Sequence, residues 1–195
     1  MTLLAALGGA AAEPLPRPSV DFAVKGTTPG REASLDLAHR GGQLRLDVGV
    51  AGLPGGVTGL IDPKRRKVVV LAAVPGMQNV AIEMDLPAEY AFASMPAEGV
   101  RGGAATVAGE ACEVWRSTVK GVPEPVEACI TADGIVLRTE ASINGRRRVV
   151  FEATEVVRAP QDPARFALPP GMKVTRLPKG MQGLLPGGLL PGLGN

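Results

Sequence analysis

Residues 104–138 read AATVAGEACEVWRSTVKGVPEPVEACITADGIVLR and hold both cysteines and the only tryptophan of the chain. Alternating β-branched and aromatic residues predict three short strands here, at 110–119, 126–131 and 135–142. Asp133-Gly134 lies between the last two and predicts a hairpin with a type I′ turn, because both residues tolerate positive φ. This stretch therefore indicates a mainly β protein built from antiparallel hairpins.

Cys112 and Cys129 fall on the first two of these strands. Gly121, Pro123 and Pro125 lie between them and can fold the chain back so that the two thiols meet. We therefore expect a disulfide, and closing a loop of this size would stabilise the fold by roughly 3 kcal/mol. The alternative is a pair of free buried thiols that act as small hydrophobic side chains.

Composition limits the class of protein. A chain of 195 residues with 45% hydrophobic residues can form one domain, and its core must be mainly aliphatic because only 3% of the residues are aromatic. The formal net charge of +2 is too small to predict a nucleic-acid partner.

Residues 1–12 form an apolar run that ends in three alanines. Small residues at this point are typical of a cleaved signal peptide, which predicts export to the periplasm. The run lacks a basic start, and the alternative is an alanine-rich terminus of a cytosolic protein. It is also too short to cross a bilayer, for which about 20 apolar residues are needed. We expect no transmembrane segment elsewhere in the chain.

The rest of the chain repeats the alternating pattern after a proline-rich lead at 13–18. Further strands are predicted at 20–25, 34–37, 44–48, 57–61, 67–74, 79–85 and 146–157, which gives about nine to ten antiparallel strands in all. The strand at 67–74 is apolar on both faces, which predicts a central position covered from both sides.

Several segments break this pattern. Gly41-Gly42 and Asn144-Gly145 predict tight turns, and 100–103 is predicted as a loop. Residues 86–95 are the best helical candidate, and 162–166 predicts a short helical turn. The tail at 176–195 repeats Leu-Leu-Pro-Gly and is expected to be irregular.

Motifs for catalysis and cofactor binding are missing. His39 is the only histidine and is predicted to lie at a solvated hairpin end. No serine stands in a G-x-S-x-G elbow, and neither a Walker loop nor a G-x-G-x-x-G fingerprint occurs. One histidine and two disulfide-spaced cysteines do not make a metal site. We therefore expect no catalytic residues, no metal and no cofactor, so that the protein is not an enzyme.

Four stretches carry a family resemblance: residues 61–64 (IDPK), 107–115 (VAGEACEVW), 128–138 (ACITADGIVLR) and 166–171 (FALPPG). With this order of elements, residues 19–175 resemble the LolA-like superfamily of bacterial envelope proteins, in particular a branch of exported domains of unknown function. The resemblance implies an incompletely closed antiparallel β-barrel, or half-barrel, with one or two short helices. Its better understood members carry lipoproteins or lipids across the periplasm, but the matching motifs assign no ligand-binding residue.

The resulting hypothesis is a non-enzymatic periplasmic binding protein that holds a lipid, an acyl chain or a lipidated partner on an aliphatic concave face. The residues predicted to form that face come from the alternating apolar positions: Phe22, Val24, Leu35, Leu37, Leu44 and Leu46. The alternative is a structural or protein-interaction module of the cell envelope, without a small ligand.

Two basic clusters occupy predicted turns. One contains Lys64, Arg65 and Arg66, and the other contains Arg146, Arg147 and Arg148. Solvated surface charge is the simple interpretation of both clusters. The more specific hypothesis is that these hairpin tips contact an anionic surface such as phospholipid or lipopolysaccharide.

Overall fold

The computed structural model describes residues 11–30, 33–50, 56–72, 80–85, 97–119 and 123–176. Within these ranges the chain forms a single 13-stranded sheet in the order β1-β8-β9-β10-β11-β12-β2-β3-β4-β5-β6-β7-β13. The strands are β1 (Glu13–Pro14), β2 (Phe22–Thr27), β3 (Ala33–Arg40), β4 (Gln43–Val50), β5 (Val57–Asp62), β6 (Lys67–Ala72), β7 (Val80–Asp85), β8 (Glu98–Val107), β9 (Glu110–Ser117), β10 (Val126–Ile130), β11 (Val136–Ile143), β12 (Arg146–Arg158) and β13 (Lys173–Arg176).

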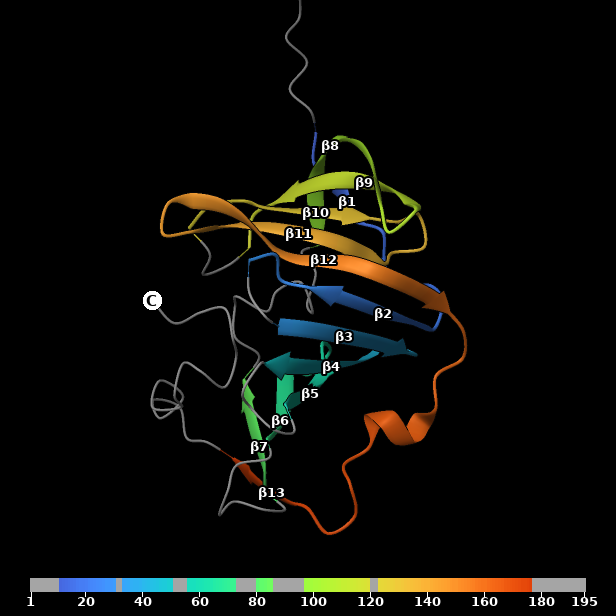
Figure 1. Cartoon of the computed structure of the whole chain (residues 1–195), viewed down its shortest axis with the longest axis vertical. Coiled ribbons are helices and arrows are strands. Elements are labelled where there is room, and N and C mark those ends of the chain that lie inside the picture. The colour runs from blue at the N-terminus through green and yellow to red at the C-terminus, as the bar shows by residue number, and fades with distance from the viewer. Residues whose placement is uncertain are drawn as a thin grey trace, which may run out of the picture.

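The sheet is strongly twisted and is not closed into a barrel. Figure 1 shows strands that run across the view at β11 and β12 and stand nearly upright at β7. Neighbouring strands rotate by about 20–25° on average, so a sheet this wide must curl. β1 and β13 form its two edges and lie far apart in the view. The prediction of a mainly β fold is confirmed.

The predicted number of strands was too low, because β1, β8 and β13 were not expected. β8 includes the segment predicted as a loop, and its Gly102 and Gly103 have low strand propensity. It is nevertheless held along β9 by a hairpin whose turn residues, Ala108 and Gly109, have φ of 52° and 77°. The all-antiparallel prediction also fails at one edge, where β13 pairs with β7 in parallel.

Helical structure in the described residues is restricted to one short 3-10 turn, η2 (Pro163–Phe166), where a helical turn was predicted. Asp162 caps it by accepting a hydrogen bond from the backbone N–H of Ala164 at 2.8 Å. Arg45 of β4 donates to the carbonyl of Arg165 at 2.7 Å, so η2 is tied to the outer face of the sheet. The helix predicted at 86–95 lies outside the described residues, as do the predicted signal peptide up to residue 10 and the tail beyond residue 176.

The predicted turns are confirmed as hairpins, with one error in type. Both Gly41-Gly42 and Asn144-Gly145 have positive φ at each residue, as tight two-residue turns require. Asp133-Gly134 instead belongs to a longer loop between β10 and β11, in which only Gly134 has positive φ. The type I′ prediction fails there because the backbone N–H of Gly134 donates to the carbonyl oxygen of Thr131 at 3.0 Å, so Ala132 and Asp133 are the central residues of the turn and Gly134 follows them.

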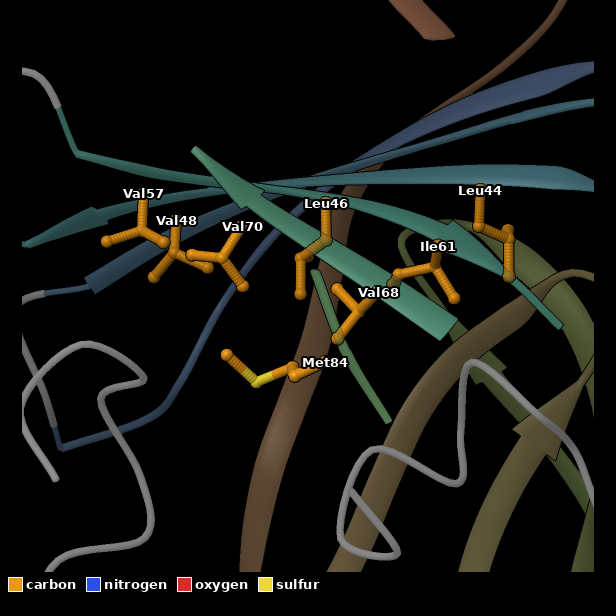
Figure 2. Packing of buried hydrophobic residues seen from close by; sticks show 8 residues of the cluster. All are labelled: Leu44, Leu46, Val48, Val57, Ile61, Val68, Val70 and Met84. Atoms are coloured by element: carbon orange, nitrogen blue, oxygen red, sulfur yellow. The ribbon is translucent and has the colours of Figure 1, made fainter. Parts of the chain in front are cut away.

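One cluster of the aliphatic core lies on one face of β4 to β7. Figure 2 shows this first cluster, in which the side chains project from the same side of their strands and pack together. Its members are Leu44, Leu46, Val48, Val57, Ile61, Val68, Val70 and Met84. On β6, Val68 and Val70 are buried in this cluster, while Val69 and Leu71 on the opposite face are half-buried. β6 is thus a central strand with partial cover on its second face.

A second cluster is formed by side chains from β2, from strands β8 to β12 and from the loop between β10 and β11. It contains Phe22, Val24, Val107, Cys112, Cys129, Ile135, Leu137 and Ala153. Cys112 and Cys129 form a disulfide between β9 and β10, with their Cα atoms 5.4 Å apart. The pairing expected from the sequence is therefore present, and free thiols are absent among the described residues.

The proline-rich lead joins the fold. β1 pairs with β8, and Leu15 is buried in a third cluster with Trp115, Ile130 and Val136. No helix in the described part of the chain is long and apolar enough to cross a membrane.

Candidate functional site

A pocket of about 360 Å³ lies on the core face of β2, β3 and β4. Its lining is predominantly apolar. The lining residues are Arg17, Pro18, Phe22, Leu35, Leu37, His39, Gly42, Leu44, Leu46, Pro63, Lys64, Gly134, Val136 and Phe151.

Strand register places the pocket side chains on one face. Phe22 stands opposite His39, and His39 stands opposite Leu44. In the next row on the same face of the sheet, Leu37 stands opposite Leu46. Residues directly opposite each other in an antiparallel pair project to the same side of the sheet, so these rows form a continuous apolar surface.

Five of the six residues predicted to bind a ligand line this pocket, and Val24 does not. Val24 is only 1% exposed and lies inside the second core cluster. Leu35 and Leu37 are half-buried, although their neighbours in the two clusters are almost fully buried. The strands thus bring the predicted residues together, and Val24 serves the core.

Phe151 of β12 lines the pocket and was not predicted to do so. Its ring lies over Gly26 of β2, where an added Cβ would stand 2.5 Å from a ring carbon and 2.5 Å from the carbonyl oxygen of Glu152. Only glycine leaves room for this approach. The glycine within an otherwise alternating strand was the sequence signal for such a close contact.

His39 is buried, which corrects the prediction of a solvated hairpin end. Its exposed fraction is 6%, and its ring stacks on Phe22 with a centroid distance of 5.2 Å. Nδ1 donates to the carbonyl oxygen of Val20 at 2.9 Å, and Nε2 accepts from the backbone N–H of Gly42 at 3.0 Å. Both ring nitrogens are therefore engaged by the backbone, and this pairing fixes the neutral tautomer.

One end of the pocket is bounded by loops, and we call this end the mouth. It is formed by the lead residues Arg17 and Pro18, the β3–β4 turn at Gly42, the β5–β6 turn at Pro63 and Lys64, and the loop at Gly134. A Cβ on Gly134 would collide with the backbone of Arg17, so the lead lies directly against this loop. The backbone N–H of Ser19 donates to the carbonyl of Asp133 at 3.1 Å and holds the two together.

An ion-pair cluster fixes the loop behind the mouth. Arg158 at the end of β12 contacts Asp133 at 2.6 Å and Glu110 at 2.9 Å. The hydrogen bond from Arg158, joined by one from Thr131, lowers the pKa of Asp133 despite its partial burial. The bonds to Asp133 and Glu110 raise the pKa of Arg158. Asp133 and Arg158 therefore remain charged at neutral pH.

The two basic clusters lie at opposite ends of the strands. Arg158 pairs with Phe22 at the mouth end of β12, whereas Arg146 begins that strand at the other end. The turn with Lys64 follows Ile61, whose partner Leu44 belongs to the mouth end. The structure thus does not unite the clusters into one basic surface.

Within each basic cluster the side chains differ in their contacts. Arg147 forms ion pairs with Glu127 at 2.6 Å and with Glu140 at 3.5 Å. Lys64, in contrast, is exposed, lines the pocket and has no ion-pair partner among the described residues. Of the six predicted basic residues, Lys64 is the one at the pocket.

Trp115 and the acidic residues do not form a second site. Trp115 is 1% exposed in the third cluster, with the guanidinium of Arg101 4.9 Å from its ring centroid, so it is a core residue. Within the described ranges no group of histidine, cysteine or acidic side chains could hold a metal ion.

Comparisons with known proteins bear on the fold. No family model matches the chain, and a search of the curated proteins finds no match. Among solved structures, the crystal structure of an uncharacterized conserved protein from Thermus thermophilus is similar, with a TM-score of 0.58 and 14% sequence identity. The match covers 82% of this chain and 91% of that chain. At this level of identity the likeness shows a shared fold.

Proposed function

We propose that the protein is a non-enzymatic binding protein of the periplasm that holds an acyl chain in the pocket of its LolA-like half-barrel. The single observation that carries this proposal is the pocket itself, whose walls are predominantly apolar and whose volume is about 360 Å³. Small-ligand sites typically measure about 300–1,000 Å³ and are mainly apolar.

The volume of the pocket, about 360 Å³, is far above that of an ordinary void in a protein core. Protein cores are close-packed, and voids larger than a water molecule are few. Leu37 packs against the first and second core clusters, yet it remains half-buried and lines the pocket. This favours ligand binding over a purely structural module, since the sheet of such a module would close around large side chains.

The polar groups of the pocket also suit binding rather than reaction. Both nitrogens of His39 are occupied by backbone partners, so the imidazole has no free site for a substrate proton. Export is supported by the disulfide between Cys112 and Cys129, because such bonds persist in oxidising compartments.

Filling the pocket tests the proposal. Leu35→Trp adds bulk to a half-buried wall residue, and we expect it to weaken uptake of a fluorescent fatty acid by about tenfold or more, which corresponds to about 1.4 kcal/mol. Val157→Trp is the matched control, because Val157 of β12 is 44% exposed and lies outside the pocket.

Equal binding by both variants and the wild type would place the acyl chain elsewhere and refute the assignment. If the wild type takes up no fatty acid at all, the structural-module alternative replaces the proposal.

A further inference from the structure

The charged residues that line the pocket have one sign. Arg17 and Lys64 line it, and no aspartate or glutamate is among its lining residues within the described part of the chain. An apolar cavity whose charged lining residues are both cations is complementary to a molecule with an apolar chain and an anionic head.

The nearby carboxylates are engaged by groups of the protein itself. Asp21 accepts a hydrogen bond from the backbone N–H of Gly41 at 3.1 Å, and Asp62 accepts one from that of Arg65 at 3.0 Å. Asp133 and Glu110 are paired with Arg158. These acidic groups are thus engaged in holding the turns and the loop around the mouth.

Lys64 is the group best placed to meet an anion. It is exposed on the β5–β6 turn, and it makes no ion pair with any residue that the structure describes. Its neighbour Lys67, in comparison, is paired with Asp85 at 2.5 Å. An ammonium group at the edge of an apolar cavity can bind a head group while the rest of the ligand stays out of water.

The size of the cavity limits the apolar part. At about 360 Å³ it is near the lower end of the usual range for small-ligand sites, about 300–1,000 Å³. This volume suits one extended chain better than the several chains of a membrane phospholipid or a lipoprotein anchor.

The geometry points to a single-chain anionic amphiphile as the ligand, with its chain along Leu37, Leu44 and Leu46 and its head group at Lys64. This inference rests on the proposed function. It adds the charge of the ligand's head group and the number of its hydrocarbon chains. The head can be a carboxylate, a phosphate or a sulfate, because each is an anion that an ammonium group binds.

Three probes with the same chain and different heads test the inference: dodecanoate, dodecan-1-ol and dodecyltrimethylammonium. The two ionic probes are titrated below their micellar concentrations and the alcohol below its solubility limit, all at neutral pH. We expect dodecanoate to bind about tenfold more tightly than the alcohol, and the cation to bind most weakly. Added salt should reduce the affinity for dodecanoate and leave that for the alcohol nearly unchanged.

Two charge reversals of equal size locate the head group. Lys64→Glu should abolish the preference for dodecanoate, whereas Arg65→Glu should retain it. Arg65 is exposed on the same turn and does not line the pocket. Its variant therefore controls for the general electrostatic effect of a charge reversal on this turn. Because both side chains are exposed, both variants should keep the melting temperature of the wild type.

The outcomes separate the two proposals. Equal affinity for all three probes would overturn the inference and leave acyl-chain binding intact. An equal loss in both variants would show a diffuse charge effect and refute the role of Lys64. If none of the probes binds, the proposed function itself fails.

Discussion

At the scale of single residues, Gly134 connects the loop behind the pocket mouth to the lead. Its φ is +84°, and a Cβ there would overlap the backbone of Arg17. Backbone atoms cannot swing away as a flexible side chain can, so any substitution must displace the lead or the loop.

Gly134→Ala should therefore destabilise the fold by about 2 kcal/mol or more, as the sum of the left-handed backbone cost and the clash. Chemical denaturation measures the effect. Gly109→Ala is the control, since Gly109 has φ of +77° with open space around it and should lose only the backbone term. If the two variants lose the same stability, the contact between loop and lead contributes nothing.

Asp133 gives the fold a dependence on pH. Its pKa is lowered by the hydrogen bonds from Arg158 and Thr131, so between its folded value and the ordinary value near 3.9 the unfolded chain binds more protons. The stability from this group is present above about pH 4 and is lost as the pH falls through the folded pKa.

We expect Asp133→Asn to cost about 1–2 kcal/mol at neutral pH, because it weakens charge-assisted bonds that are partly exposed. The difference in melting temperature from the wild type should shrink as the pH falls below about 4. Asp36→Asn removes the same charge from β3, away from the ion-pair cluster of Arg158, and serves as control. A difference that stays constant with pH would contradict the role of Asp133.

At the scale of elements, the disulfide links β9 to β10 within the second core cluster. Cys112 and Cys129 are 17 residues apart and both are nearly fully buried. The bond restricts the unfolded chain across the proline-rich connection and thereby favours the folded state.

Replacing both cysteines with alanine should lower the free energy of unfolding by about 2–4 kcal/mol. Denaturant titration of the variant and the wild type under non-reducing conditions measures the loss. Alkylation of the unfolded, unreduced wild type should modify neither cysteine. Labelling at both sites would contradict the bond and remove one support for export.

Sequence patterns predicted the strands well where apolar and polar side chains alternate. They predicted poorly the strands that are held in place by backbone pairing with a neighbouring strand. The strands with Phe22 and Leu44 were found because apolar residues recur every second position. β8 was missed because its glycines carry no such pattern, and its pairing with β9 holds it in place. β13 is a short edge strand whose partner is about 90 residues away in the chain, a contact that no local pattern reveals.

The same distinction applies to the pocket. The alternating pattern predicted that Leu35, Leu37 and Leu46 lie on one face of the sheet. It did not predict which loops enclose these residues. The lead at Arg17 and the turn at Lys64 meet there through long-range packing, so the cationic mouth was not predictable. His39 was misplaced for the same reason, since its burial depends on Val20 and Phe22 of another part of the chain.

At the scale of the whole molecule, one open sheet carries three core clusters. Leu37 packs against the first and the second of them, and it lines the pocket, which is a space on the core face of β2, β3 and β4. The curvature of a wide twisted sheet produces such a space, and the loops at one end give it a cationic mouth. The central claim is that this space holds an acyl chain.

Methyl-labelled leucine NMR tests that claim most directly, because it reports the ligand's position residue by residue. Titration with dodecanoate should shift the methyl resonances of Leu35, Leu37, Leu44 and Leu46, which line the pocket, and leave that of Leu60 unchanged. Leu60 lies on β5 and does not line the pocket. Unchanged pocket methyls at saturating dodecanoate, or shifts confined to Leu60, would contradict the claim.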